Sequence, residues 1–309
     1  MSNFARDYMA SFNTQTMKSW IITAILFLFG VCATHAGGKR ALLIGISQYP
    51  SQRSPELTWN PIHGANDVAL IKKTLQKQGY AITALTDANA TASKIRSAFA
   101  KLAKDVKPDD IVYIHFSGHG QSYEDLSGDE ADGWDEALVP YDAMLQFKQG
   151  VYDGSSHIVD DELERYLTAI RQKAGKNGQV YVVLDACHMG GASRGDEMEE
   201  DELYIRGTDK GFTPSGKKYI PRIDRRGNMK VQSHPAMAHI CIIEACRAYQ
   251  TNAEIKQDGN YYGPLTYYIN QTLQKVRLSS DTGWVETVRS LMGKDRRLIK
   301  QNMVTEKSN

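Results

Sequence analysis

The fold is decided by the stretch Asp110–Gly120, which reads DIVYIHFSGHG. A short run of β-branched and aromatic residues is typical of a strand buried on both faces of a parallel sheet. The stretch Gln179–His188, QVYVVLDACH, has the same design. Each run ends abruptly in small or polar residues. Each of these ends holds a side chain that could act in catalysis, His119 in the first and Cys187 in the second.

Strand and helix patterns alternate along the rest of the chain. Strands are expected at residues 39–46, 80–85, 110–116, 179–184 and 238–245, and amphipathic helices at 66–79, 91–106, 160–175, 265–276 and 285–292. Such alternation gives right-handed crossovers and a mostly parallel sheet with helices on both faces. The sequence therefore predicts one α/β domain of three layers over residues 38–292. Residues 293–309 are polar and are predicted to be a frayed helix end.

Composition excludes several classes of protein. The 309 residues are 41% hydrophobic and 24% charged, which is typical of a globular domain with a sizeable core. The net charge of +1 argues against nucleic acid as the main partner, because phosphate-binding domains usually carry a clear basic excess.

The N-terminal segment has the pattern of a secretory signal. Lys18 precedes the apolar run 20–31, and small residues up to Ala36 follow it. We expect residues 1–36 to be a cleaved leader, which makes the protein periplasmic or extracellular. The run is shorter than the about 20 residues of a membrane span, so an uncleaved anchor is the lesser alternative. Met17 stands just before Lys18 and is a candidate for the true start.

Three cysteines remain after such a leader is removed. An odd number in an exported chain predicts at least one free thiol. Cys241 and Cys246 are five residues apart, which places them on opposite faces of a strand. Both are expected to be buried as small hydrophobic residues.

Residues 191–235 do not fit a compact core. They carry many charges and glycines, including the basic pairs Lys217-Lys218 and Arg225-Arg226. A long stretch of this kind inside a domain is usually functional or disordered. A functional loop and a solvated surface insertion both remain open.

His119 and Cys187 form the candidate catalytic pair. Catalytic groups gather at the carboxyl ends of strands in open α/β sheets, so the two side chains meet if their strands are neighbours. A cysteine becomes a strong nucleophile when a nearby group accepts its proton, and His119 would be that base. The backbone N–H groups of Cys187 and Gly118 are the candidates for holding the oxyanion, a contribution of about 2.7–4 kcal/mol per donor in a known case. Gly190 and Gly191 would let further backbone N–H groups approach the substrate carbonyl and form the oxyanion hole with the N–H of Cys187.

These residues also allow other assignments. A lone cysteine at a strand end most often packs, and a lone histidine is most often structural. His115 and His188 are alternative bases, but His115 lies inside the strand and His188 would point away from its neighbour. Zinc is the weaker reading, since Cys187 and His188 lack C-x-x-C spacing and no second ligand pair appears.

The two strand-end motifs, Ser117–Gly120 and Asp185–His188, resemble the histidine and cysteine motifs of metacaspases, within the caspase-like cysteine peptidases. The resemblance covers roughly residues 39–276 and includes the segments 39–46, 64–68, 128–142, 245–251 and 262–268. It implies a caspase-like three-layer sandwich and a monomeric cysteine endopeptidase acting on proteins or peptides, with no required cofactor.

The resemblance also implies a specificity. It assigns Asp67, Ser117 and Asp185 to the pocket for the residue before the scissile bond. Caspases proper carry glutamine where this chain has Asp185. Two carboxylates in a partly desolvated pocket favour a guanidinium or an ammonium group, so cleavage after Arg or Lys is expected. Asp67 could also simply cap its helix.

An acidic segment, Gly128–Glu136, fails the EF-hand pattern. The resemblance nevertheless allows calcium, with Asp160 and Asp161 as part of the implied site. The simpler interpretation is a charged loop that shapes the pocket entrance.

The leading hypothesis is an exported cysteine endopeptidase that cleaves after Arg or Lys and nicks itself within residues 191–235. The alternative is a catalytically silent caspase-like scaffold that binds proteins; retention of both His119 and Cys187 favours the enzyme. A third possibility is another Arg- or Lys-specific cysteine peptidase of the same topology. It would differ from the leading hypothesis in family but hardly in chemistry.

Overall fold

The computed structural model describes residues 37–187, 204–220, 234–247, 249–279 and 281–308. The expected leader at 1–36, His188 and the pair Arg225-Arg226 lie outside these residues. None of the helices in the described ranges is long and apolar enough to cross a membrane.

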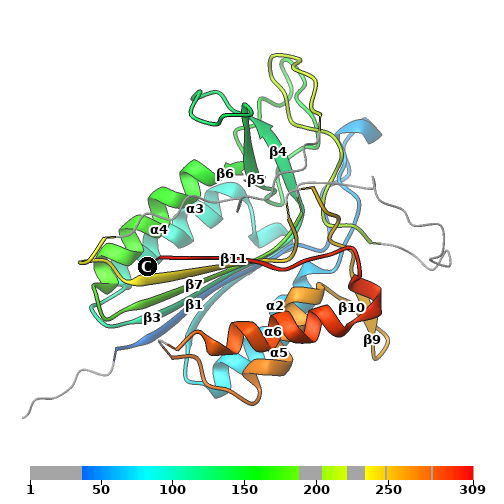
Figure 1. Cartoon of the computed structure of the whole chain (residues 1–309). Helices are drawn as coiled ribbons and strands as arrows, with labels where there is room; N and C mark the ends of the chain where they lie inside the picture. Colours follow the sequence, from blue (N-terminus) through cyan, green and yellow to red (C-terminus); the bar gives the residue numbers. More distant parts are fainter. Residues whose placement is uncertain (1–36, 188–203, 221–233, 248, 280, 309) are drawn as a thin grey trace, which may run out of the picture. The chain divides into compact units, whose positions relative to one another are not determined.

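A six-stranded sheet forms the centre of the domain (Figure 1). Its strands, in spatial order, are β11 (Val304–Lys307), β8 (His239–Glu244), β7 (Gln179–Asp185), β3 (Ile111–Ser117), β1 (Lys39–Gly45) and β2 (Ala81–Thr86). Neighbouring strands run parallel except β11, which is antiparallel to β8. The predicted, mostly parallel α/β sheet is confirmed.

Helices cover both faces of this sheet. In Figure 1, α3 (Ala92–Asp105) and α4 (Asp160–Ala174) lie on one face, and α2 (Gly64–Lys77), α5 (Pro264–Leu273) and α6 (Gly283–Lys294) lie on the other. Successive strand side chains alternate between the faces, so Leu42 packs in one apolar core and Leu43 in the other. The two cores explain why the central strands read as continuous apolar runs rather than as an alternating pattern.

The two strands that carry the candidate pair are neighbours. All seven residues of β3 pair in parallel register with β7, from Ile111 opposite Gln179 to Ser117 opposite Asp185. His119 and Cys187 each follow two residues after this last pair. The central strands therefore deliver both residues to the same edge of the sheet.

Two small sheets flank that edge. Strands β4 (Gly120–Glu124), β5 (Trp134–Leu138) and β6 (Ile158–Val159) form one, and β9 (Ile255–Gln257) with β10 (Asn260–Tyr262) form the other. Neither was predicted, because strands of two to five residues with charged members carry too little apolar periodicity. Three short 3₁₀ turns complete the described elements, at Pro55–Leu57, Asp87–Asn89 and Arg296–Leu298.

The described part of the 191–235 segment, residues 204–220, belongs to the packed domain. Phe212 is fully buried, its N–H donates to the Ser122 carbonyl at 2.8 Å, and its carbonyl accepts from the Glu124 N–H at 2.9 Å. Arg206 is also fully buried. A solvated surface insertion is therefore the wrong description of this part.

The tail expected to fray is instead structured. After α6, residues Val304–Lys307 form β11 along the edge of the main sheet, and Met303 and Leu298 join the core. The strand was missed because it is short and half-exposed, as edge strands often are.

Candidate active site

Cys187 lies just beyond β7, and its side chain is buried. Its Sγ donates a hydrogen bond to the Gln250 carbonyl at 2.6 Å. Its backbone N–H donates to the Arg206 carbonyl at 3.0 Å. The thiol and the N–H of the same residue therefore each meet a carbonyl of another segment.

His119 lies in the turn between β3 and β4. Its Nε2 bonds to the Asn60 carbonyl at 2.9 Å, and since a carbonyl only accepts, Nε2 carries the hydrogen. The other nitrogen, Nδ1, is buried and has no hydrogen-bond partner among the described residues. Burial lowers the pKa of His119 to about 4. The imidazole is thus neutral near pH 7 with its lone pair on Nδ1, the form that a general base requires.

His119 and Cys187 lie at the same edge of the sheet, but each is hydrogen-bonded to a different backbone carbonyl, that of Asn60 for His119 and that of Gln250 for Cys187. The thiol points its proton at Gln250, while Nδ1 has no hydrogen-bond partner in the part of the chain that the structure describes. Proton transfer from Cys187 to His119 therefore requires the thiol to turn from the Gln250 carbonyl toward Nδ1. Catalytic hydrogen bonds are often unmade before substrate binds.

A second thiol stands beside the first. Cys246 Sγ also points at the Gln250 carbonyl, at 3.5 Å, and neither cysteine forms a disulfide with another described residue. The hydrogen bond with Cys187, together with burial, raises the pKa of Cys246 well above its ordinary value. The expectation of a plain packing role holds for Cys241, which lies in the apolar core, but Cys246 lies against the candidate nucleophile.

His115 has a structural role. The Tyr113 hydroxyl lies 3.2 Å from its Nδ1, and the Thr266 hydroxyl lies 3.1 Å from its Nε2. Burial lowers the pKa of His115 to about 4. With both ring nitrogens engaged, it has no nitrogen left to act as the base.

The three residues assigned to the specificity pocket lie together and fully buried. The Ser117 hydroxyl donates to Asp67 Oδ2 at 2.6 Å. Asp185 accepts from the Thr266 N–H and hydroxyl, at 2.8 and 2.7 Å, and from the Asn252 amide at 2.8 Å. The fold thus brings together Asp67, Ser117 and Asp185, the three residues that the resemblance assigns to the pocket.

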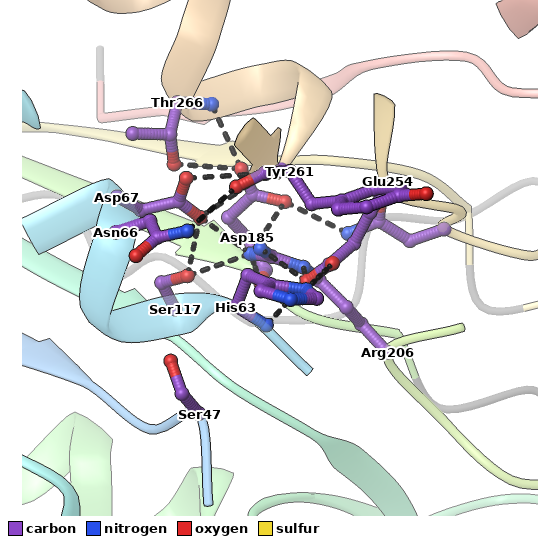
Figure 2. A network of polar contacts seen from close by, with 12 residues as sticks. Ser47, His63, Asn66, Asp67, Ser117, Asp185, Arg206, Glu254, Tyr261 and Thr266 are labelled. Carbon is purple, nitrogen blue, oxygen red and sulfur yellow. Dashed lines mark hydrogen bonds and ion pairs between the residues drawn. The ribbon is translucent and has the colours of Figure 1, made fainter. Parts of the chain in front are cut away.

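This pocket is filled by an arginine of the chain itself, as Figure 2 shows. Arg206 Nη1 lies 2.7 Å from Asp67 Oδ2, 3.5 Å from Asp185 Oδ1 and 2.6 Å from the Ser117 hydroxyl. Its Nε and Nη2 donate to Glu254 Oε1 at 3.0 and 2.8 Å. A buried guanidinium therefore meets three buried carboxylates.

The electrostatics of this cluster favour a cation. Burial raises the pKa of Asp67 to about 7, although Arg206 opposes the shift. Burial would lower the pKa of Arg206, but Asp67, Glu254 and Asp185 reverse that effect and hold the pKa above its ordinary range. Without a cation, three carboxylates in a dry pocket would repel one another, so the pocket suits a guanidinium or an ammonium group.

The backbone around Arg206 is also engaged. Residues 204–206 run antiparallel to residues 252–254, with Ile205 opposite Ala253. The Arg206 N–H donates to the Asn252 carbonyl at 3.0 Å, and the Glu254 N–H donates to the Tyr204 carbonyl at 2.9 Å. The segment is thus paired with residues 252–254 through one antiparallel β-bridge.

Two backbone N–H groups converge on the carbonyl oxygen of Arg206. They belong to Cys187, at 3.0 Å, and to Gly120, at 3.2 Å. The expected second donor was Gly118, but its N–H donates to the Asp185 carbonyl at 3.4 Å, as part of the β3–β7 ladder. The second donor is therefore the N–H of Gly120, the residue after His119, because the N–H of Gly118, the residue before it, is bound within the sheet.

The sequence reasoning missed Arg206, Glu254 and Asn252. No local pattern marks them, since Glu254 and Asn252 lie in a short irregular stretch and Arg206 in a segment without periodicity. The one available signal was Tyr204-Ile205, an apolar and aromatic pair that precedes Arg206 inside an otherwise charged region.

The acidic residues form a group of their own. Asp125, Asp129 and Asp135 have carboxylate oxygens within 4.8 Å of one another. Burial, with Asp125 and Asp161 nearby, raises the pKa of Asp135 to about 7. Burial, with Asp135 and Asp161, raises the pKa of Asp160 to about 7. The implied pair Asp160 and Asp161 thus lies near Asp135, one member of this cluster. Carboxylate oxygens are of the ligand type that calcium takes.

Comparison with known proteins gives a consistent result. The family model of the caspase domain matches residues 38–307. Metacaspase-1B of Aspergillus terreus is 28% identical over 285 residues, covering 81% of this chain and 69% of that protein. Metacaspase-1A of Aspergillus fumigatus is 34% identical over 274 residues, covering 77% and 62%. The chain thus spans about two thirds of the length of these relatives.

A solved structure shares the fold. Protein GSU0716 from Geobacter sulfurreducens matches with a TM-score of 0.57 and 21% identity, covering 88% of this chain and 94% of that chain.

Proposed function

The chain belongs to the caspase-domain family of cysteine peptidases, and on that premise we propose that it is an endopeptidase that cleaves proteins after Arg or Lys. The nucleophile is Cys187 and the base is His119. The observation that supports the proposal is that neighbouring strands bring a buried thiol and a neutral imidazole to one sheet edge, beside a cluster of three buried carboxylates.

The chemistry follows from the atoms at this edge. The thiol proton passes to His119 Nδ1, and the sulfur attacks the substrate carbonyl carbon. The N–H groups of Cys187 and Gly120 hold the oxygen as it becomes negative. The imidazolium returns the proton to the leaving amine, which leaves a thioester. Water then hydrolyses the thioester and restores the thiol.

The pocket supports the preference for basic residues. Asp67, Asp185 and Glu254 surround the guanidinium of Arg206, with the Ser117 hydroxyl as a further acceptor. An arginine of a substrate would make the same charge-assisted bonds, and a lysine would make fewer of them, because it lacks the planar fork of donors. A substrate aspartate would add a fourth negative charge.

Three further properties belong to the proposal. Export rests on the leader pattern at residues 1–36, and the mature protein would begin after Ala36. A monomer acting alone on protein substrates needs no cofactor for this chemistry. Calcium would be held by Asp125, Asp129 and Asp135 with Asp160 and Asp161, where it would neutralise carboxylates beside β5 rather than take part in bond cleavage.

Self-processing within residues 191–235 is also proposed. Of the two basic pairs in this segment, Lys217-Lys218 is exposed in the structure. Lys217 Nζ, however, donates to the Gly133 carbonyl at 2.8 Å and lies over the Trp134 ring, so Lys217 is engaged away from the pocket.

Hydrolysis of fluorogenic peptides that end in Arg, Lys or Asp tests the function. Wild type is expected to hydrolyse the Arg and Lys peptides only. Cys187→Ala and His119→Ala should each lower kcat by about 10³-fold or more, with unchanged circular dichroism. Cys246→Ala, which removes the neighbouring thiol, is the matched control and should retain activity. A wild type that is inert toward all three peptides, with or without calcium, would favour the scaffold instead.

A further inference from the structure

The segment Tyr204–Gly207 lies in the active site with the contacts of a bound substrate. The guanidinium of Arg206 fills the carboxylate pocket, as Figure 2 shows. The carbonyl oxygen of Arg206 receives the N–H groups of Cys187 and Gly120. The backbone that leads to Arg206 pairs with residues 252–254 through the bridge between Ile205 and Ala253. Side chain, carbonyl and backbone are thus each held by a separate part of the site.

We propose that the peptide bond between Arg206 and Gly207 is the internal cleavage site of this enzyme, and that Tyr204-Ile205-Arg206 is bound as its own substrate. This inference rests on the proposed peptidase function and names the bond that it acts on within the chain.

The carbonyl contacts distinguish this arrangement from an ordinary buried ion pair. An arginine that only balanced Asp67, Asp185 and Glu254 could enter the pocket from any direction and leave its own carbonyl elsewhere. Here the same residue places its carbonyl oxygen 3.0 Å from the nucleophile's own N–H. Two N–H donors on one carbonyl polarise it and prepare it for attack.

The residues before Arg206 are also recognised. The Tyr204 ring packs edge-on against His63 and Tyr261, with ring centroids 4.5 and 4.8 Å away. His63 in turn bonds to Glu254 through Nδ1 at 2.6 Å. Antiparallel pairing to an exposed edge, with side chains in pockets, is a common way for a protein to hold a peptide.

The reaction balances with water as the only co-reactant. Cys187 Sγ bonds to the carbonyl carbon of Arg206, and its proton goes through His119 to the nitrogen of Gly207. The bond from Arg206 to Gly207 breaks, which frees a new amino terminus at Gly207. Water then splits the thioester, leaves a carboxylate on Arg206 and returns the thiol.

Uncut, the chain occupies the pocket that an external substrate needs. Cleavage separates Arg206 from Gly207, so residues 204–206 are then held at one end only and can leave the pocket. We therefore expect hydrolysis of an added Arg peptide to begin slowly and to rise in step with the fraction of cut chain.

The test is to incubate the purified full chain and to read new amino termini by mass spectrometry. Wild type should yield a fragment that begins at Gly207, whereas Cys187→Ala should stay intact. Arg206→Lys should be cut at the same bond more slowly, and Arg206→Gln should not be cut there. Lys210→Gln removes an exposed basic residue of the same segment and is the matched control, which should be cut like wild type. The variant Lys217→Gln/Lys218→Gln should also be cut at Gly207.

Arg206→Gln leaves three buried carboxylates without their cation and could prevent folding. A second measurement covers that case. Trypsin acting on the intact Cys187→Ala chain should cut after the exposed Lys210 and spare the bond after the buried Arg206. Rapid tryptic cleavage at Gly207 would overturn the buried placement.

Two failures are distinguishable. If wild type hydrolyses Arg peptides at full rate while uncut, or cuts itself only elsewhere, this inference is overturned and the peptidase function stands. If it neither hydrolyses Arg peptides nor cuts itself, the proposed function fails as well.

Discussion

The indole of Trp59 stacks on the imidazole of His119, with ring centroids 4.7 Å apart and an angle of 27° between the planes. Both side chains are buried, and Tyr49 packs on the same imidazole with centroids 5.2 Å apart. This stack does two things at once. It fixes the ring so that Nε2 reaches the Asn60 carbonyl, and it removes the water that would stabilise an imidazolium.

Trp59→Ala should therefore change the acid limb of the pH–rate profile. Burial is the main cause of the low pKa of His119, about 4, so hydration of the ring should move that pKa up toward 6.5. We expect the acid limb of kcat/KM to move upward with it, and kcat at pH 7.5 to fall roughly tenfold as the base loses its orientation. Trp59→Phe keeps a stacked ring and should resemble wild type. An acid limb unmoved by Trp59→Ala would mean that another group controls it.

Asp67→Asn and Asp185→Asn should each weaken cleavage after Arg. Each change removes a charged acceptor from the pocket, and such a bond contributes about 1.5–3 kcal/mol, so kcat/KM for Arg peptides should fall roughly 10- to 100-fold. The loss should be smaller for a peptide that ends in Gln, which carries no charge. Equal losses on both peptides would show that the variants damage the fold rather than the specificity.

Asp160→Asn should stabilise the protein in a pH-dependent way. Burial and its acidic neighbours raise the folded pKa of Asp160 to about 7, above the unfolded value of 3.8. The favourable contribution of the protonated carboxyl is fully present below pH 3.8 and is lost as pH rises through 7. The neutral amide should thus raise the free energy of unfolding at pH 8 by about 1 kcal/mol, measured as a higher urea midpoint. It should have little effect at pH 4.

The exposed Asp209→Asn is the control for that experiment and should show no such difference. Calcium gives a second readout, since an ion bound by the acidic group would neutralise the same repulsion. Calcium at pH 8 should therefore raise the midpoint of wild type more than that of Asp160→Asn. A midpoint insensitive to calcium in both proteins would exclude these carboxylates as its ligands.

Gly263→Ala should disturb the pocket. A Cβ at this position would lie 2.2 Å from Asp185 Oδ2 and 2.5 Å from Arg206 Nη1, so the backbone or the ion pair has to move. We expect a loss of about 1–3 kcal/mol in the free energy of unfolding, measured by denaturant titration. Gly293→Ala, in α6 with no atom of the described residues within 4 Å of the added carbon, should instead gain about 0.5–1 kcal/mol. Similar stabilities for the two variants would contradict the close approach at Gly263.

Gln301→Ala should weaken both stability and activity. The Gln301 amide donates to the Ala245 carbonyl at 3.0 Å and to Asn252 Oδ1 at 2.9 Å, and its removal leaves buried acceptors unpaired. The expected cost is about 1–3 kcal/mol. Peptide hydrolysis should fall as well, since Asn252 bonds to Asp185 and to the Arg206 backbone. Asn302→Ala changes an exposed side chain and is the matched control; an equal effect there would remove Gln301 from this role.

The parts of the site that the sequence predicted are those encoded locally. His119 and Cys187 each follow a short apolar run, and the change from apolar to small and polar residues marks the end of a strand buried on both faces. Asp67, Ser117 and Asp185 came from the family resemblance, and the fold brings them together. Arg206, Glu254 and Cys246 were beyond prediction in these terms, because they meet partners on distant segments: Arg206 lies 48 residues from Glu254, and Cys246 lies 60 residues from Ala186.

The same reasoning explains the missed strands. Val304–Lys307 has two residues typical of strands, but it becomes one only where β8 offers an open edge. The short strands β4 and β5 depend equally on each other. Pairing between distant segments leaves little trace in a window of a few residues.

The two hydrogen bonds of the Gln301 amide have a consequence for the stage of synthesis at which the molecule gains activity. During translation, His119 and Cys187 emerge from the ribosome well before residues 301–307. A growing chain at that stage lacks the amide that holds Asn252 and the strand that closes the sheet beside β8. If activity depends on Gln301 as expected, a nascent polypeptide would gain its full proteolytic activity only after these residues are made.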